Sequence, residues 1–178
     1  MNIIDLDLEI LKFFNRPFSV YLNIFFLLAI YSVYPTLLLI GYHLFRNKKR
    51  KRLFHLITAS VIGVLLVLAL KYAIARPRPY SAGIGVVKIF EKTDPSFPSA
   101  HTFIAFLCFY FLPKNLPKWL VYFSAIYLLI LIPIGSMYIG VHYPSDIIAG
   151  AIIGIAVPKI ISEKRANRIV DLFSKQIL

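Results

Sequence analysis

The sequence predicts an all-α integral membrane bundle with five spans and an N-terminal interfacial helix, six helices in total. Two observations support this fold class. Hydrophobic residues make up 59% of the 178-residue chain, and they are gathered in long runs with few charges. A soluble domain is nearer half apolar, whereas a run of about 20 apolar residues can cross a bilayer. The length suits a single domain over residues 1–178.

Five apolar runs are the candidate spans. In order, they cover Phe18–Phe45, Leu53–Ala75, Ser99–Leu112, Trp119–Tyr138 and Ser145–Ile161. Pro35 predicts a kink in the first run, and the third is short for a span. Before them, residues 1–15 mix apolar and acidic side chains. This mixture favours an amphipathic helix lying in the membrane interface, with a sixth, short span as the alternative.

Basic residues predict the orientation of the bundle. The connection Arg46–Arg52 reads RNKKRKR, and the connection Pro113–Lys118 holds two lysines. The C-terminal end adds Lys159, Lys164, Arg165, Arg168 and Lys175. With five spans these segments share one side, which the positive-inside rule assigns to the cytoplasm, together with the C-terminus. This pattern accounts for the net charge of +12 at an inner membrane, so nucleic acid is not expected as a partner.

The outer loop, residues 76–98, runs against this charge pattern. It carries Arg76, Arg78, Lys88 and Lys92, and Lys71 lies just before it. Snorkelling of side chains at a membrane boundary explains one or two such cations but five poorly. The loop therefore predicts an anionic ligand on the outside.

The segments around Lys71 and Ser99 are suited to binding a phosphate ester. Lys71 and Arg78 can neutralise the phosphoryl charge, and arginine can hold two phosphate oxygens at once. Pro98-Ser99 reads as a helix start, so the Ser99 hydroxyl and the N–H of Ala100 can face the anion. His101, in the first turn, can give a proton to the departing oxygen.

The segment HYPSD, from His142 to Asp146, supplies a nucleophile and its orienting carboxylate. Pro144 suits the first position of a helix, so Asp146 falls in the first turn. Asp146 can accept the Nδ1 proton of His142 and leave Nε2 free to attack phosphorus. A metal site built from His101, His142 and Asp146 is the alternative. The neighbouring cations would repel a divalent ion, so neither metal nor cofactor is expected.

Together these segments resemble the signature of the type 2 phosphatidic acid phosphatase family, which also includes vanadium haloperoxidases. The family pattern is K-x6-RP, then PSGH, then SR-x5-H-x3-D, and the matched stretch runs from Lys71 to Asp146. The resemblance implies a metal-independent phosphatase with a helical-bundle fold. It also implies roles: phosphate binding by Lys71, Arg78 and Ser99, with His101 as general acid, His142 as nucleophile and Asp146 as its orienter.

Two positions depart from the family pattern. Ala100 replaces a glycine but keeps its backbone N–H. Ser136 stands where the family has arginine, and Gly135 replaces the preceding serine, so one phosphate-binding cation is missing. Arg76, Lys88 and Lys92 of the outer loop are the candidates to replace it.

The predicted function is hydrolysis of a lipid phosphate monoester or diphosphate at the level of the headgroups. The resemblance leaves four substrates open: lipid A 1-phosphate, phosphatidylglycerophosphate, undecaprenyl diphosphate and phosphatidic acid. No obligate protein partner is expected. A catalytically silent lipid-phosphate binder or transporter is the alternative, with Ser136 as its support, and a soluble phosphoester substrate is a third option.

Overall fold

The structure is a computed structural model that describes residues 3–16, 19–166 and 168. Residues 1, 2, 17, 18, 167 and 169–178 lie outside the description, including Phe18 of the first predicted span and Lys175 of the basic C-terminal end. In the part of the chain that is described, every regular element is a helix. The predicted all-α class is therefore confirmed.

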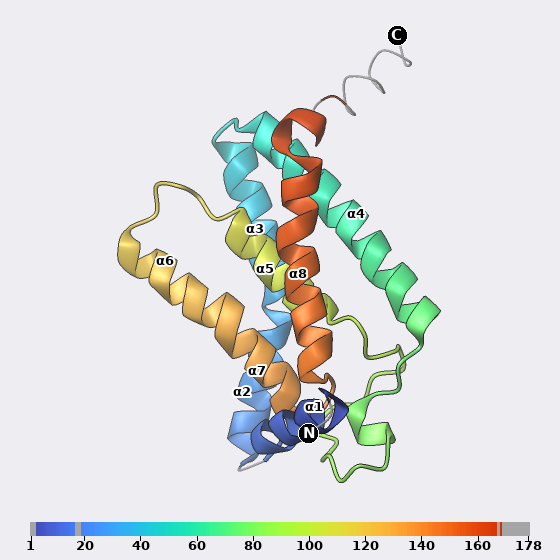
Figure 1. Cartoon of the computed structure of the whole chain (residues 1–178). Coiled ribbons are helices and arrows are strands. Elements are labelled where there is room, and N and C mark those ends of the chain that lie inside the picture. Colours follow the sequence, from blue (N-terminus) through green and yellow to red (C-terminus); the bar gives the residue numbers. More distant parts are fainter. Residues whose placement is uncertain (1–2, 17–18, 167, 169–178) are drawn as a thin grey trace.

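Among the described residues, four helical stretches are long and apolar enough to cross a bilayer (Figure 1). The first combines α2 (Val20–Tyr31) and α3 (Val33–Arg46), and the second contains α4 (Arg50–Ile74) and the short helix η1 (Pro79–Ser81). The third runs through α6 (Lys118–Ala125), the π-helical η2 (Ile126–Leu131) and α7 (Ile132–Tyr138), and the fourth is α8 (Pro144–Ile161).

The first stretch breaks at Ser32, near the kink predicted at Pro35. Proline has no N–H to donate to the carbonyl four residues earlier, so the helical ladder is interrupted just before it. At the break, the Ser32 hydroxyl donates to the Ala29 carbonyl at 2.6 Å and lies 2.6 Å from the Tyr127 hydroxyl. The break therefore ties the first span to the third stretch.

The prediction of five full spans is corrected by α5 (Ala100–Tyr110). This helix has 11 residues, so it is about 16 Å long and too short to cross a bilayer. It lies inside the bundle, where Phe103, Leu107 and Phe111 are buried (Figure 1). Irregular backbone at membrane depth is tolerated where protein encloses it, so the helix can start below the surface.

Glycines bring α5 and α8 into close contact. A Cβ at Gly150 would lie 2.4 Å from the Ser99 carbonyl oxygen, and one at Gly154 would lie 2.7 Å from that of Phe103. Small residues four apart let two helix backbones approach in this way. The Ser99 N–H consequently donates to the Asp146 carbonyl at 3.0 Å. This packing joins the second and third predicted site segments.

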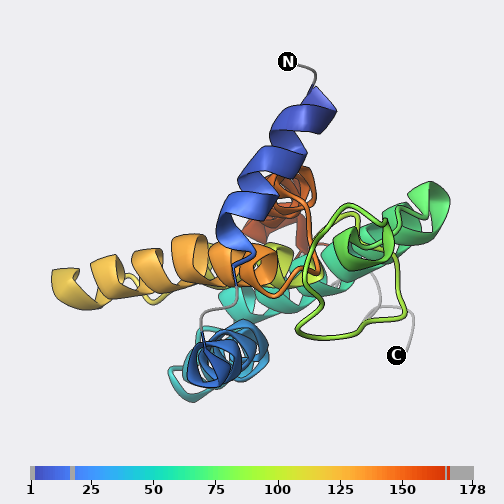
Figure 2. The same cartoon turned by 90° about the horizontal axis from the view of Figure 1, so that it is seen from below.

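The helix α1 (Ile3–Phe14) lies crosswise at the end of the bundle that carries the outer loop (Figures 1 and 2). Its 12 residues span only about 18 Å. Leu11 is buried against Met137, Tyr143 and Ile147, while Phe13 is exposed. This placement fits the predicted interfacial helix rather than a sixth span.

The basic segments meet at the opposite end of the bundle. A cavity of about 800 Å³ there is lined by Lys48–Arg52, by Tyr110 at the end of α5, by Lys114 after it, and by Ser162 after α8. The three basic regions therefore share one end, as the charge pattern predicted.

Candidate active site

Two buried cations converge at the end of the bundle near α1. Lys71 lies in the last turn of α4, and Arg78 lies in the loop that follows; both are almost fully buried. The Asp94 carboxylate bridges them, with one oxygen 2.9 Å from Lys71 Nζ and the other 2.7 Å from Arg78 Nη2. Arg78 Nε also donates to the Asp94 carbonyl, and Lys71 Nζ donates to that of Pro95. The cations thus form an anion site that holds a carboxylate of the same chain.

The electrostatics of Asp94 agree with that arrangement. Burial by itself raises the pKa of this carboxyl, but Lys71 and Arg78 together lower it to about 2. Asp94 is therefore ionised at neutral pH. Its side chain is 39% exposed, whereas those of the two cations are 3% and 4% exposed. The anion site therefore opens to the surface of the protein at Asp94.

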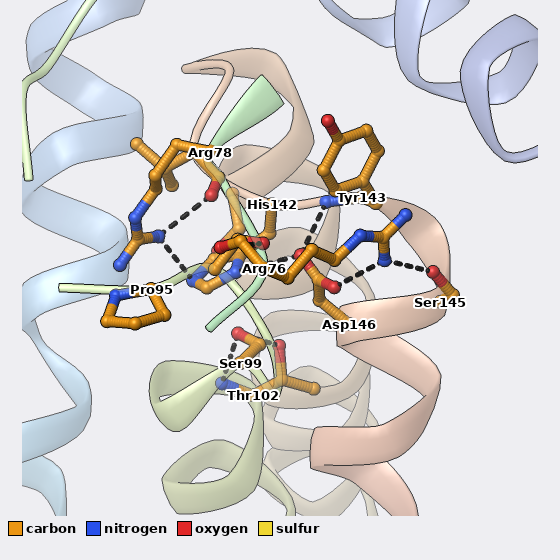
Figure 3. Close-up of polar contacts among 12 residues, drawn as sticks. Arg76, Arg78, Pro95, Ser99, Thr102, His142, Tyr143, Ser145 and Asp146 are labelled. Carbon is orange, nitrogen blue, oxygen red and sulfur yellow. Dashed lines mark hydrogen bonds and ion pairs between the residues drawn. The ribbon is translucent and has the colours of Figure 1, made fainter. Parts of the chain in front are cut away.

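The geometry around His142 defines its tautomer. Arg78 Nη1 lies 3.3 Å from His142 Nε2, and because arginine can only donate, that nitrogen is the acceptor (Figure 3). The proton must then be on Nδ1, which faces the Asp146 carboxylate at 3.5 Å. This distance is longer than a hydrogen bond, as catalytic contacts often are before substrate binds. The lone pair of Nε2 points toward the anion site.

His142 is neutral at physiological pH. Burial lowers the pKa of its imidazole to about 4, despite the opposing effect of the Asp146 carboxylate. A nucleophile needs its lone pair free, so a neutral ring suits attack on phosphorus. Asp146, predicted in the first turn, is the third residue of α8, and its Oδ2 accepts the Tyr143 N–H at 2.9 Å.

The start of α5 lies beside this pair. Ser99 is the N-cap, as predicted, and its Oγ accepts from the Thr102 N–H at 3.4 Å and the Thr102 hydroxyl at 3.0 Å. Its own hydroxyl hydrogen remains available to an anion. Ala100 begins the helix, so no carbonyl within the helix accepts its N–H.

His101 faces the same cluster from α5. Its Nε2 lies 3.4 Å from the Tyr34 hydroxyl, and its ring packs edge-on against Tyr31 at 5.2 Å. Lys92 and Arg78 are near enough for their charges to act on the ring. The structure therefore brings together Lys71, Arg78, Ser99, Ala100, His101, His142 and Asp146.

The three candidate replacement cations have different surroundings. Arg76 pairs with two carboxylates, those of Asp7 and Asp146. Lys88 pairs with Glu91 at the exposed surface of the loop, 3.1 Å away. Lys92 has its ammonium 5.4 Å from the centre of the Tyr31 ring. Among the residues described, that ammonium has neither a hydrogen bond nor a carboxylate partner.

Several site residues were missed by sequence reasoning. Asp94 shares the outer loop with the predicted cations, and an acid among them was a usable signal. Asp7 and Tyr34 belong to segments read only as membrane elements. Nothing in the local sequence connects these two residues to His142 or His101, because only packing of distant helices does so.

Asp94 competes with any anion for Lys71 and Arg78, so Asp94→Asn should strengthen inhibition by vanadate. Removing one negative charge from the site should lower the inhibition constant by roughly tenfold, or about 1.4 kcal/mol. Dose–response curves for vanadate at neutral pH measure the change. Glu91→Gln, on the same loop, is the control and should match the wild type. Weaker vanadate inhibition in Asp94→Asn would contradict the competition.

Within residues 3–16, 19–166 and 168, no group of three His, Cys, Asp or Glu side chains is placed to hold a metal ion. The carboxylates and the histidine at this end of the bundle instead contact cations: Asp94 pairs with Lys71 and Arg78, Asp146 pairs with Arg76, and His142 lies beside Arg78. This arrangement suits an anion.

Known proteins resemble this chain in both sequence and fold. The model of the PAP2 superfamily matches residues 52–169. The Bacillus licheniformis protein named bacitracin transport permease protein BcrC is 31% identical over 87% of this chain and 78% of its own. An undecaprenyl-diphosphatase of Sulfolobus acidocaldarius is 32% identical over 61% of this chain and 52% of its own. The crystal structure of Aquifex aeolicus LpxE matches with a TM-score of 0.77 and 31% identity, over 90% of this chain and 98% of that one.

The helical membrane bundle, the paired histidines and the buried cations define the class of protein as an integral membrane phosphatase. The chain belongs to the PAP2 superfamily. An undecaprenyl-diphosphatase is among its relatives, so the comparisons support enzymatic hydrolysis rather than silent binding.

Proposed function

We propose that this protein removes phosphate from a lipid phosphate monoester or diphosphate through a phosphohistidine at His142. The observation that carries the proposal is the Asp94 carboxylate, which marks an anion site between Lys71 and Arg78 next to Nε2 of His142. A phosphoryl group that displaced Asp94 would meet both cations and the start of α5. The attacking nitrogen would then be in reach of phosphorus.

The reaction has two steps in this proposal. Nε2 of His142 attacks phosphorus, the bond from phosphorus to the lipid oxygen breaks, and that oxygen takes a proton from His101. A water molecule then attacks the phosphohistidine, giving its proton to His101, and the P–N bond breaks to release inorganic phosphate. Asp146 stabilises the positive ring in between, because it faces the Nδ1 proton.

The proposed location follows from the two ends of the bundle. The basic segments share the end opposite the site (Figure 1), which by the positive-inside rule supports a site at the periplasmic or outer face of the inner membrane and a cytoplasmic C-terminus. The outer loop and α1 would then lie at headgroup level (Figure 2). A lipid can bring its phosphate to that level from the side.

Purified protein in detergent tests the function. It should release inorganic phosphate from one or more members of a panel of undecaprenyl diphosphate, phosphatidylglycerophosphate, phosphatidic acid and lipid A 1-phosphate. Vanadate should block the release, and EDTA should not reduce it. The name of the Sulfolobus acidocaldarius relative favours undecaprenyl diphosphate within that panel. Binding of these lipids without any phosphate release would support a silent binder instead.

We further propose that Lys92 replaces the missing family arginine. Ser136 is fully buried, and its hydroxyl donates to the Ile132 carbonyl at 3.1 Å, so it brings no charge to the site. Arg76 and Lys88 already have carboxylate partners. The backbone of Lys92 is held at both its N–H and its carbonyl by the Tyr80 hydroxyl, at 2.8 and 2.7 Å. Its ammonium lies by the Tyr31 ring, which packs edge-on against His101.

The Lys92 proposal predicts a basic limb in the pH profile. Burial and the neighbouring Arg78 lower the pKa of Lys92 to about 8, so the ammonium loses its charge as pH rises through that value. In the wild type, kcat/KM should fall roughly fivefold from about pH 8 to about pH 9, because the free enzyme loses one binding cation. Lys92→Gln should have a low kcat/KM without that limb, while Lys88→Gln keeps the wild-type profile. The same limb in Lys92→Gln would contradict the assignment.

A further inference from the structure

The interfacial helix α1 carries a buried carboxylate that reaches the start of α8. Asp7 is 7% exposed, although it belongs to a helix at the edge of the bundle. Its Oδ1 accepts the Ser145 N–H at 2.8 Å, and its Oδ2 accepts the Ser145 hydroxyl at 2.6 Å. A buried charge is costly unless it is paired. Asp7 is thus held by the first turn of the helix that carries Asp146.

Arg76 connects Asp7 to Asp146. One nitrogen of the guanidinium, Nη2, lies 2.8 Å from Asp7 Oδ2, and the other, Nη1, lies 2.7 Å from Asp146 Oδ1. Nη1 also donates to the Ser145 hydroxyl at 2.7 Å, and the guanidinium carbon lies 3.7 Å from the centre of the Tyr143 ring. Figure 3 shows Arg76 on one side of Asp146 and His142 on the other. Arg76 is therefore a bridge between carboxylates.

The bridge determines how the Asp146 carboxylate is turned. Its Oδ1 is taken by Arg76, so its Oδ2 is the oxygen left to accept the Tyr143 N–H and to face Nδ1 of His142. The contact with His142, at 3.5 Å, has to shorten when the ring becomes positive. A carboxylate that is free to rotate would lose that alignment.

A second tie holds α1 in place. The Asn15 side chain just after α1 donates to the Tyr138 carbonyl at 2.8 Å, and its oxygen accepts the Val87 N–H at 2.7 Å. Gly140 allows the two segments to approach closely, since a Cβ there would lie 2.6 Å from the Val87 carbonyl oxygen. Its φ of +77° also favours glycine. The interfacial helix is therefore fastened to the outer loop and to the segment before His142.

We propose that α1 is a positioning element of the active site, with Asp7 acting through Arg76 to orient Asp146 and thereby the His142 ring. The proposal rests on the proposed role of His142 as nucleophile. Docking of α1 at the membrane surface is then a condition for an aligned nucleophile. Asp7 and Arg76 touch no reacting atom, so their effect is on the chemical step and not on phosphate binding.

Asp7→Asn tests this role, because it keeps the shape of the side chain and removes the charge. We expect kcat to fall roughly tenfold to a hundredfold, as when a group that orients a catalytic residue is lost. KM and the inhibition constant for vanadate should stay within about twofold, since Lys71 and Arg78 are unchanged. Glu9→Gln, an exposed charge change on the same helix, is the matched control and should keep the wild-type kcat.

A double-mutant cycle separates positioning through Arg76 from general stabilisation. In an Arg76→Gln background, Asp7→Asn should lower kcat by less than about threefold, because the bridge is already broken. Asp7→Glu should recover part of the activity. If Asp7→Asn does not fold, Arg76→Lys is measured in its place and should lower kcat at unchanged vanadate affinity, because an ammonium lacks the planar fork.

Wild-type kcat in Asp7→Asn, equal losses in Glu9→Gln, or full additivity in the cycle would overturn the inference. None of these outcomes affects the proposed reaction, which is tested by His142→Ala in the same assay. Activity that survives His142→Ala overturns the proposed function itself, so the two failures are distinguishable.

Discussion

His142→Ala should release no measurable phosphate, with kcat at least about 10⁴-fold below the wild type. In the proposed reaction the His142 imidazole is the attacking group, since its Nε2 lies 3.3 Å from Arg78 Nη1 at the anion site. Lys71, Arg78 and the start of α5 would remain, so vanadate and phosphate should still bind. Phosphate release from the preferred lipid, measured alongside vanadate binding, checks both parts.

The intermediate gives a second readout for the same residue. Rapid acid-free quenching of the wild type with radiolabelled lipid phosphate should trap label on the protein at His142, and His142→Ala should trap none. His43→Ala, which changes a histidine near the opposite end of the bundle, is the control and should label as the wild type does. Label on any other residue would be inconsistent with the mechanism.

Arg78→Lys should lower kcat/KM by roughly 10² to 10³-fold, although it keeps the positive charge. Arg78 uses all three of its nitrogens: for the Asp94 carbonyl, for the Asp94 carboxylate, and for Val141 and His142. A lysine ammonium cannot reproduce this planar set of donors. The loss should appear in KM as well as in kcat, because in the proposed reaction Arg78 binds the phosphoryl group of the substrate and also meets the charge that develops on it. Kinetics across a range of substrate concentrations separates the two.

Arg46→Lys is the matched control for this substitution. Arg46 is exposed at the end of α3 and bonds only to the Tyr42 hydroxyl, at 3.1 Å, among the contacts described. Its replacement should leave kcat/KM within about twofold of the wild type. If Arg78→Lys retained nearly full activity, a single point charge would suffice, and the bidentate role of Arg78 would be wrong.

The sequence by itself determined the fold class and indicated the candidate site residues. An apolar run of about 20 residues crosses a bilayer as a helix, because a helix pairs its own backbone N–H and C=O groups where no water is present. The basic connections marked one end of the bundle. The spacing around Lys71, Ser99 and His142 pointed to phosphate, because cations, a helix start and a histidine with a nearby carboxylate are what a phosphoryl group requires. Local rules of helix capping also placed Ser99 and Pro144 correctly.

Only the tertiary structure decided which partner each charged group has. Arg76, Lys88 and Lys92 were equivalent candidates in the sequence, and contacts with Asp7, Asp146 and Glu91 separated them. Tertiary structure likewise decided the length of α5. Because the other helices enclose it, α5 can begin within the bundle and need not cross the whole membrane. Asp7 illustrates the physical reason, since its role comes from a hydrogen bond to Ser145, 138 residues away. Such contacts depend on how whole helices pack, and no local pattern encodes that packing.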